Sequence, residues 1–231
     1  MLDLNNFTSF SQFDPEDMLG QIDSLPAQLE SAWKLGMGQP LPQPAPIRQV
    51  VVAGMGGSAI GADLLSAYVA PLCSVAVSVH RDYGLPAWAS GPETLVVASS
   101  HSGNTEETLS AYQQAREAGC ALLVLSTGGR LAQSGDSDGV PVWRFEHRGQ
   151  PRAAVGFSFG LLLAALERLG LIPPQESRVQ ETAAEMRRQQ ETIGAASPTA
   201  KNPAKRMAGQ LVGRYVTIFG AGILAPVARR W

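Results

Sequence analysis

Residues 96–108 read Val96-Val97-Ala98-Ser99-Ser100-His101-Ser102-Gly103-Asn104-Thr105-Glu106-Glu107-Thr108. An apolar, β-branched run ends in a group of hydroxyl side chains and a glycine, and a helical pattern begins directly behind it. This is typical of a buried strand that ends in a polar loop at the start of a helix. The first turn of a helix leaves backbone N–H groups unpaired and carries about half a positive charge, so the loop favours an anion. Four neutral hydroxyls stand beside those donors, a combination that suits a phosphate: Ser99, Ser100, Ser102 and Thr105.

The sequence on both sides of this loop alternates between apolar runs and helical patterns. Strands are expected at residues 49–53, 74–79, 95–99, 121–125 and 140–145. Helices are expected between them, at residues 60–68 and 105–117, and after them at residues 153–169. Strands that alternate with helices of this length indicate a parallel sheet with helices on both sides. The predicted fold class is therefore α/β, with a doubly wound, five-stranded parallel sheet and flanking helices.

Outside this sheet the sequence predicts mostly helix. Asp14 and the residues after it start an N-terminal helix that Pro26 ends, and a second helix precedes a proline-rich arm at residues 36–47. The charge-rich helix at residues 176–193 is interpreted as a solvated connector rather than a partner-binding helix. Residues 215–219 are expected to form a sixth strand that opens a further α/β unit. The predicted parts are residues 1–47 (helices and arm), 48–170 (α/β domain), 171–213 (helical connector) and 214–231 (start of an incomplete second domain).

Composition narrows the classes of function. The chain has 231 residues, 45% of them hydrophobic, and a net charge of −2 without a long basic run, which does not indicate nucleic acid or an anionic membrane as a partner. No apolar stretch approaches the roughly 20 residues that span a bilayer, and the N-terminus has no basic segment, so a cytoplasmic protein is expected. Cys73 and Cys120 are interpreted as small buried hydrophobic residues rather than as a disulfide or a metal site.

A glycine-rich turn follows the first expected strand. It reads Gly54-Met55-Gly56-Gly57-Ser58-Ala59, which matches a dinucleotide-binding fingerprint, and Asp82 stands where a ribose partner would. A tight strand-to-helix turn needs glycines whatever the ligand is, and residues 220–225 repeat the pattern. Nucleotide binding stays open as an alternative. The favoured interpretation makes Gly56, Gly57 and Ser58 a second wall of the anion site, because the carboxyl ends of parallel strands meet at one edge of the sheet.

The polar residues at the start of the helix that begins near residue 105 have a second interpretation. Ser102 and Thr105 could simply cap this helix, although capping needs one hydroxyl rather than four. Glu106 and Glu107 are interpreted as complementing the helix dipole rather than as a catalytic base. The hydroxyl cluster therefore favours phosphate binding over capping alone.

Arginine and histidine supply the remaining candidates. Arg152 stands just after the fifth strand, near the same edge of the sheet, where its guanidinium could meet substrate oxygens; the alternative is a surface arginine. The three histidines, His80, His101 and His147, show no metal-ligand spacing, so no metal site is expected, although His101 lies inside the hydroxyl loop.

These motifs together resemble the sugar isomerase (SIS) domain, and more closely the bifunctional phosphoglucose/phosphomannose isomerase family. The matching segments are residues 14–19, 54–58, 100–108, 151–158, 220–222 and 226–231. The resemblance implies that Arg152 faces the reacting end of a sugar phosphate and stabilises an enediolate. It implies that the phosphate is held by Gly56, Gly57, Ser58, Ser100, Ser102 and Thr105.

Members of this family have two SIS domains, and this sequence matches the first domain and the start of the second. The resemblance places the proton-transferring glutamate shortly after the segment matched by Trp231, and a ring-opening histidine later still. In an intact homologue it implies interconversion of glucose 6-phosphate or mannose 6-phosphate with fructose 6-phosphate through a cis-enediol, without metal or cofactor. For a chain truncated within the second domain we expect phosphosugar binding with little or no turnover. A homodimer is expected, because an unfinished domain exposes apolar surface. A regulatory phosphosugar-sensing module and a nicotinamide-dependent oxidoreductase remain as alternatives.

Overall fold

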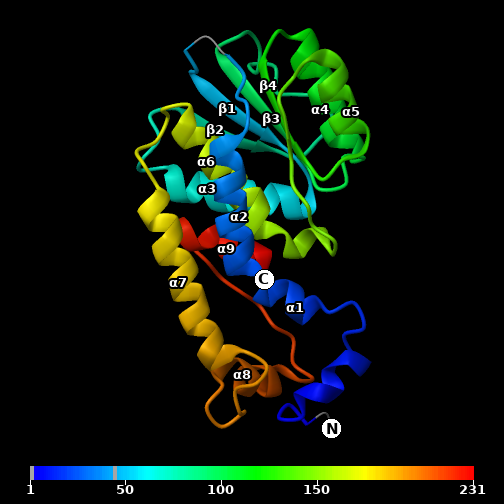
Figure 1. Ribbon diagram of the computed structural model, residues 1–231, viewed down its shortest axis with the longest axis vertical. Coiled ribbons are helices and arrows are strands. Elements are labelled where there is room, and N and C mark those ends of the chain that lie inside the picture. Colours follow the sequence, from blue (N-terminus) through cyan, green and yellow to red (C-terminus); the bar gives the residue numbers. More distant parts are fainter. Residues whose placement is uncertain (1–2, 44–45) are drawn as a thin grey trace.

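Five parallel strands form the centre of the fold (Figure 1). The computed structural model describes residues 3–43 and 46–231. The strands are β1 (Gln49–Ala53), β2 (Ala76–His80), β3 (Thr94–Ser100), β4 (Ala121–Ser126) and β5 (Val142–Arg144). They lie in the order β2-β1-β3-β4-β5, and every neighbouring pair is parallel. This arrangement confirms the predicted five-stranded parallel sheet, and it makes the gap between the carboxyl ends of β1 and β3 the point where the winding direction reverses.

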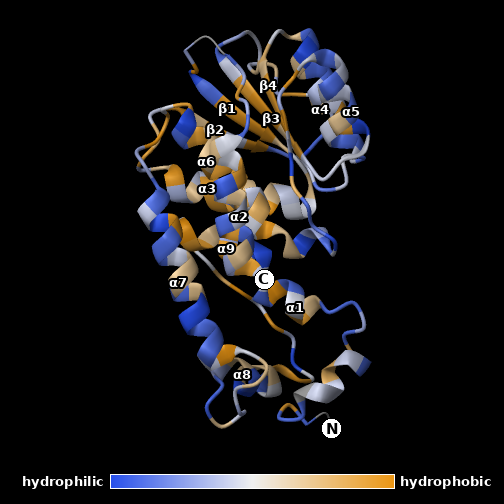
Figure 2. Ribbon diagram, viewed as in Figure 1, coloured by the Kyte–Doolittle hydropathy of each residue, from blue (hydrophilic) through white to orange (hydrophobic). Residues whose placement is uncertain are grey.

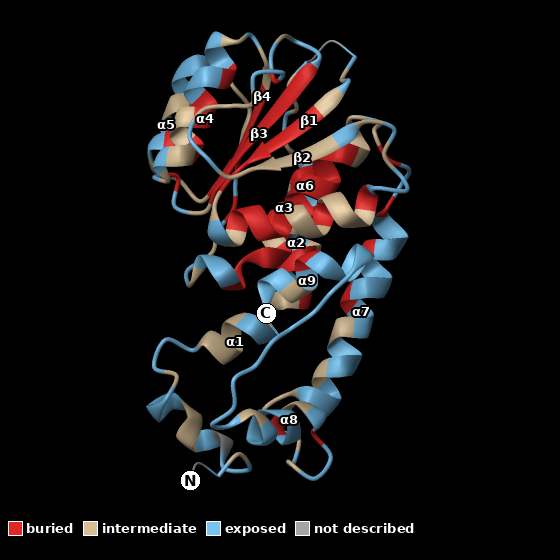
Figure 3. Ribbon diagram, turned by 180° about the vertical axis from the view of Figure 1, so that it is seen from behind, coloured by how far each residue is buried: buried red, intermediate tan, exposed pale blue. Residues whose placement is uncertain are grey.

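Helices cover both faces of the sheet. One face carries α2 (Leu25–Gly38), α3 (Gly56–Val69) and α6 (Val155–Arg168), and the other carries α4 (Glu106–Glu117) and α5 (Gly129–Asp138) (Figure 1). Successive side chains of a strand point to opposite faces, so Val50 lies in the same core cluster as Leu65 of α3, whereas Val51 lies in the other cluster with Tyr112 of α4. Burial on both faces explains the continuous apolar runs of the central strands, which Figure 3 shows as buried.

Shorter elements and a long polar helix complete the chain. They are η1 (Phe7–Gln12), α1 (Met18–Asp23), η2 (Pro151–Ala153), α7 (Glu176–Ile193), α8 (Pro203–Leu211), η3 (Gly222–Leu224) and α9 (Ala225–Arg230). The helix predicted at residues 176–193 is confirmed as α7. It is mostly hydrophilic in Figure 2 and buries only Val179 and Ala183. The interpretation of this helix as largely solvated therefore agrees with its exposure.

Two sequence predictions are wrong. Residues 215–219 form no strand, and their apolar side chains are exposed, with Tyr215 at 98% and Phe219 at 90%. A strand needs a neighbour to pair with, and the described residues offer this segment none. Pro26 does not end the first helix but lies in the first turn of α2, where the missing N–H of proline is tolerated.

Smaller differences concern the ends of elements. The helix expected at residues 153–169 is α6, which begins at Val155 after the separate turn η2, and α5 was not predicted. Residues 44 and 45 of the expected arm, and residues 1 and 2 of the N-terminal part, lie outside the described residues. Among the helices that the structure describes, none is both long and apolar enough to cross a membrane.

Candidate functional site

Glycines bring the three predicted segments of the site together at the carboxyl edge of the sheet. A Cβ on Gly54 would lie 2.7 Å from the carbonyl oxygen of Ser99, so the turn after β1 lies directly against the end of β3. A Cβ on Gly57 would overlap the carbonyl group of Pro151, so the same turn contacts the peptide that precedes Arg152. Gly56 adopts a φ of +50°, a conformation that other residues rarely adopt. The glycine turn is thus the common neighbour of the hydroxyl loop and of the Arg152 segment.

Two hydroxyls of the loop after β3, those of Ser100 and Thr105, contact each other. Ser100 Oγ lies 2.9 Å from Thr105 Oγ1 and accepts a hydrogen bond of 3.1 Å from the Gly103 N–H. Ser102 Oγ accepts from the Asn104 N–H at 3.2 Å. Thr105 is the N-cap residue of α4, yet its side chain makes no capping bond. Neither of the two hydroxyls proposed as caps therefore caps this helix.

The hydroxyls predicted to bind phosphate differ in their exposure to solvent. Ser58 and Ser100 are buried, Thr105 is half-buried and Ser102 is exposed. A ligand that reaches the loop from solvent therefore meets Ser102 and Thr105 first. Ser58 belongs to the first turn of α3 and Ser100 ends β3, so both are positioned by regular structure.

The N-terminus of a third helix, α5, contacts the same loop, and this helix was not predicted from the sequence. The Leu131 N–H of α5 donates to the Gly103 carbonyl at 2.8 Å, and the Arg130 N–H donates to Asn104 Oδ1 at 3.1 Å. The signal was present, because residues 126–129 read Ser-Thr-Gly-Gly behind an apolar strand and repeat the hydroxyl-and-glycine pattern. The N-termini of α3, α4 and α5 thus lie at one edge of the sheet, where their partial positive charges favour an anion.

His101 and His147 form a hydrogen-bonded pair next to the hydroxyl loop. His101 Nε2 lies 2.9 Å from His147 Nδ1, so one ring donates and the other accepts. Burial lowers the pKa of both imidazoles, and the proximity of His147 lowers the pKa of His101 further. The described residues contain no cluster of three or more side chains able to hold a metal ion. A small cavity lined by Ser58, His101 and Pro151 places His101 where the three segments meet.

Arg152 lies in η2 and is exposed. It lines a cavity of about 770 Å³ together with Glu16 and Arg230. Arg230 Nη1 donates to the carbonyl oxygen of Arg152 at 3.0 Å, and burial lowers the pKa of Arg230. Among the described residues, Ser102 and Thr105 line neither this cavity nor the small one beside His101. The structure therefore joins Arg152 to the glycine turn through the backbone, and Arg152 and Arg230 both line the larger cavity.

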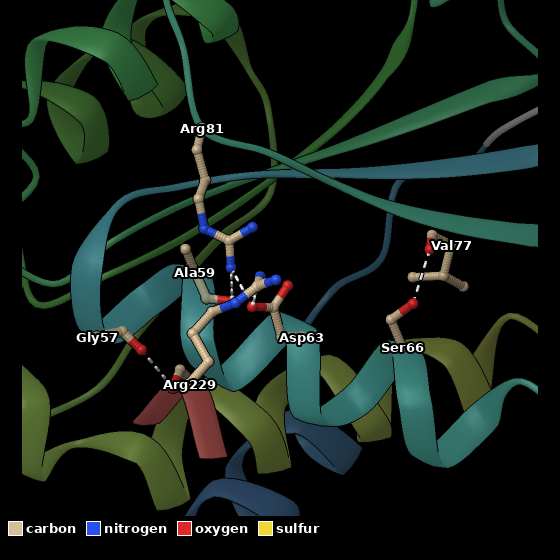
Figure 4. Close-up of polar contacts among 8 residues, drawn as sticks. Gly57, Ala59, Asp63, Ser66, Val77, Arg81 and Arg229 are labelled. Carbon is tan, nitrogen blue, oxygen red and sulfur yellow. Dashed lines mark hydrogen bonds and ion pairs between the residues drawn. The ribbon is translucent and has the colours of Figure 1, made fainter. Parts of the chain in front are cut away.

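A charged cluster lies on α3 behind the glycine turn, and nothing in the sequence indicates it. Asp63 pairs with Arg81, which also donates to the Ala59 carbonyl at 3.2 Å, and with Arg229 of α9 at 2.8 Å. Figure 4 shows both guanidinium groups directed at the Asp63 carboxylate. The side chain of Asp63 is only 12% exposed. The cluster fixes α9 against the helix whose first turn contains Ser58.

The sequence of the chain is similar to those of known proteins. No protein-family model matches the chain. A bifunctional phosphoglucose/phosphomannose isomerase from Caldicellulosiruptor bescii is 40% identical over 216 residues, which are 93% of this chain and 63% of the relative. The chain belongs to the sugar isomerase (SIS) family. A second relative, a D-glucosamine-6-phosphate 4-epimerase from Sulfolobus acidocaldarius, is 29% identical over 184 residues, covering 79% of this chain and 55% of that protein.

Solved structures confirm the SIS fold. The tagatose-6-phosphate ketose/aldose isomerase of Escherichia coli superposes with a TM-score of 0.55 at 17% identity, covering 92% of this chain and 57% of that one. At this identity the likeness shows the fold alone. The chain spans 63% of the length of the Caldicellulosiruptor relative and 55% of that of the Sulfolobus relative.

Proposed function

We propose that this chain binds a sugar 6-phosphate and is the phosphate-binding part of an aldose–ketose isomerase that interconverts glucose 6-phosphate or mannose 6-phosphate with fructose 6-phosphate. One observation supports this most strongly: the glycine turn and the hydroxyl loop flank the gap between β1 and β3, where the winding of the sheet reverses. Ligands of open α/β sheets bind at such a point. The kinship with bifunctional phosphoglucose/phosphomannose isomerases supports the choice of substrate.

The proposed phosphate site uses hydroxyl and backbone donors without a buried cation. The N-termini of α3 and α4 supply N–H groups and partial positive charge. The first N–H groups of α5 already bond to the loop, so α5 adds partial positive charge only. On binding, Ser100 and Thr105 would exchange their mutual hydrogen bond for bonds to phosphate oxygens, so no hydroxyl is left without a partner. The residues assigned to the phosphate are Gly56, Gly57, Ser58, Ser100, Ser102 and Thr105.

Arg152 is proposed to act at the reacting end of the sugar. The peptide that precedes Arg152 contacts Gly57 of the proposed phosphate site, and a planar cation with paired donors suits the two oxygens of an enediolate. Proton transfer between the two carbons needs a base within hydrogen-bond reach. The family resemblance assigns that role to a glutamate of the longer relatives, and we propose that the described residues contribute binding of the substrate rather than this step.

Each of the four predicted parts of the chain has a role in this proposal. We propose residues 48–170 as the phosphosugar-binding domain, with residues 1–47 packed around it and residues 171–213 as a connector. Residues 214–231 are proposed to belong to a second SIS domain, in keeping with their exposed apolar side chains and with the greater length of the relatives. The same exposed surface favours a homodimer.

Thermal melting with different ligands tests the proposal. Fructose 6-phosphate at 100 times its dissociation constant should stabilise the chain by about 2.7 kcal/mol, and NAD should not. A shift with NAD and none with sugar phosphates would favour the oxidoreductase alternative. A turnover assay with fructose 6-phosphate adds a second test, because a rate near that of intact relatives would contradict the assignment of proton transfer to residues outside this sequence.

A phosphosugar epimerase is the second candidate. The Sulfolobus relative, named as a D-glucosamine-6-phosphate 4-epimerase, is similar over 79% of this chain. The proposed phosphate site would serve that reaction equally well, since it holds the part of the substrate that does not react. Melting with glucosamine 6-phosphate beside fructose 6-phosphate discriminates the two by which ligand gives the larger shift at equal concentration.

A further inference from the structure

Two glutamines of the N-terminal helices hold the segment that contains Arg152. We propose that Gln21 and Gln28 are positioning residues, which fix the backbone on either side of Arg152 so that its guanidinium meets the reacting end of the substrate. This inference rests on the proposed function and extends it to a part of the chain, α1 and α2, that the phosphate site does not use.

Gln21 holds the residue before η2. Its Oε1 accepts a hydrogen bond of 2.8 Å from the Gln150 N–H, and its Nε2 donates to the Glu16 carbonyl at 2.8 Å. A side chain on Gly149 would overlap the Gln21 amide, so glycine is what allows this approach. The side chain of Gln150 returns the contact by donating to Glu16 Oε2 at 2.9 Å. Gln150, two residues before Arg152, is thus hydrogen-bonded to α1 and to the turn that precedes this helix.

Gln28 holds the residue after Arg152. Its Nε2 donates to the Ala153 carbonyl at 3.0 Å and to Ser24 Oγ at 2.9 Å. Gln28 is only 4% exposed, and its Oε1 is buried without a hydrogen-bond partner in the described part of the chain. A buried amide with an unsatisfied oxygen destabilises a fold. An apolar side chain at position 28 would avoid this cost. We therefore attribute the presence of a glutamine to its hydrogen bond with the Ala153 carbonyl.

The need for such support follows from the element itself. η2 is a single 3₁₀ turn of three residues, which has poor internal hydrogen-bond geometry. On its other sides it meets Gly57 of α3 and Arg230 of α9. The contacts to Arg152 itself and to its two neighbours in the segment engage backbone, and the Arg152 side chain is exposed. Orientation of this kind contributes to binding of a reacting centre only if the supporting residues are themselves held in place.

Two ligands separate positioning of Arg152 from general damage. Inorganic phosphate probes the hydroxyl loop alone, whereas arabinonate 5-phosphate carries a carboxylate that stands in for the enediolate. Gln21→Ala should weaken binding of arabinonate 5-phosphate by about tenfold, the equivalent of one lost hydrogen bond, and that of phosphate by less than twofold. Gln28→Met, which keeps the buried volume, should do the same. Equal weakening of both ligands, or of neither, would overturn the proposal.

Gln190→Ala is the matched control. Gln190 Nε2 donates to the Asp23 carbonyl at the end of α1 at 2.7 Å, so this variant also loses a glutamine bond to the N-terminal segment, away from η2. It should leave both affinities unchanged. A loss like that of Gln21→Ala would show that any loosening of this segment suffices, which contradicts a specific role for Gln21.

A double-mutant cycle with Arg152→Ala tests whether the effect passes through Arg152. In that background, Gln21→Ala should cause no further loss of arabinonate 5-phosphate affinity, and a full additional tenfold loss would contradict the proposal. Hydrogen exchange of the Gln150 amide gives a readout that needs no ligand, and it should lose protection in Gln21→Ala. If wild-type protein binds neither ligand, the proposed function and this inference both fail. If it binds both, and Gln21→Ala binds as wild type does, only the positioning role fails.

Discussion

Arg229 Nη1 donates a hydrogen bond of 2.8 Å to Asp63 Oδ2, an oxygen that Arg81 also contacts. The two arginines come from distant parts of the chain, the end of β2 and α9, and converge on one nearly buried carboxylate of α3. This contact connects residues 225–230 to the helix that begins at the glycine turn. It is therefore a direct link between the last described helix and the candidate site.

Removal of Asp63 should destabilise the protein more than removal of Arg229. Arg229→Ala should lower the free energy of unfolding by about 0.5 to 1 kcal/mol, because the arginine side chain is 65% exposed and Asp63 keeps Arg81. Asp63→Ala should cost about 2 kcal/mol, since it removes the nearly buried carboxylate that both arginines share and leaves their two positive charges side by side. Urea denaturation measures both values. Arg178→Ala, which breaks an exposed pair with Glu181, is the control and should change stability by less than 0.5 kcal/mol or so. Equal effects of the first two variants would argue against Asp63 as the centre of the cluster.

Gly57→Ala should impair the site. The added methyl group would overlap the Pro151 carbonyl. Since this carbonyl is part of the backbone and cannot rotate away as a side chain would, the glycine turn and the Arg152 segment must move apart. We expect a loss of about 1 to 3 kcal/mol in stability together with weaker binding of fructose 6-phosphate. Gly38→Ala, at the end of α2 where a Cβ meets nothing within 4 Å, should be neutral or slightly stabilising. Unchanged ligand binding by Gly57→Ala would contradict the close approach of the two segments.

The histidine pair predicts a dependence of stability on pH. Burial lowers the pKa of His101 and of His147 below the ordinary value of 6.5, so the unfolded chain binds more protons than the folded one near that pH. The stabilising contribution of the neutral pair is present above about pH 6.5 and is lost as the pH falls below it. The double variant His101→Gln, His147→Gln should show a flatter fall in the free energy of unfolding between pH 7 and pH 5. A slope equal to that of the wild type would contradict the shifts, as would imidazole ¹⁵N titrations of both rings at 6.5.

The strands were the most predictable part of the fold. A strand buried on both faces must be apolar throughout, and residues 49–53 match β1 residue for residue. The same reasoning failed at residues 215–219, whose pattern is equally strand-like, because a strand also requires a neighbour and pairing is not encoded locally. α5 was missed because its ten residues include only Leu131 and Ala132 as buried apolar side chains, too few for a helical period.

The composition of the site was easier to predict than its connections. Hydroxyls and glycines behind apolar strands indicate their position, because the carboxyl ends of parallel strands share an edge. The contacts that organise the site join residues far apart in sequence, as Gln21 and Gln150 or His101 and His147 do. No local pattern indicates such pairs, since a glutamine on a short amphipathic helix looks like any solvated side chain.

Binding of fructose 6-phosphate to the wild-type chain and to Ser102→Ala and Thr105→Ala tests the central claim most directly. Titration calorimetry should show a complex for the wild type and a loss of about ten- to hundredfold in affinity for each variant, in keeping with one lost hydrogen bond to a charged group. The controls Ser177→Ala and Thr192→Ala remove exposed hydroxyls of α7 and should bind as the wild type does. If both loop variants retain wild-type affinity, the phosphate is not held by the loop between β3 and α4.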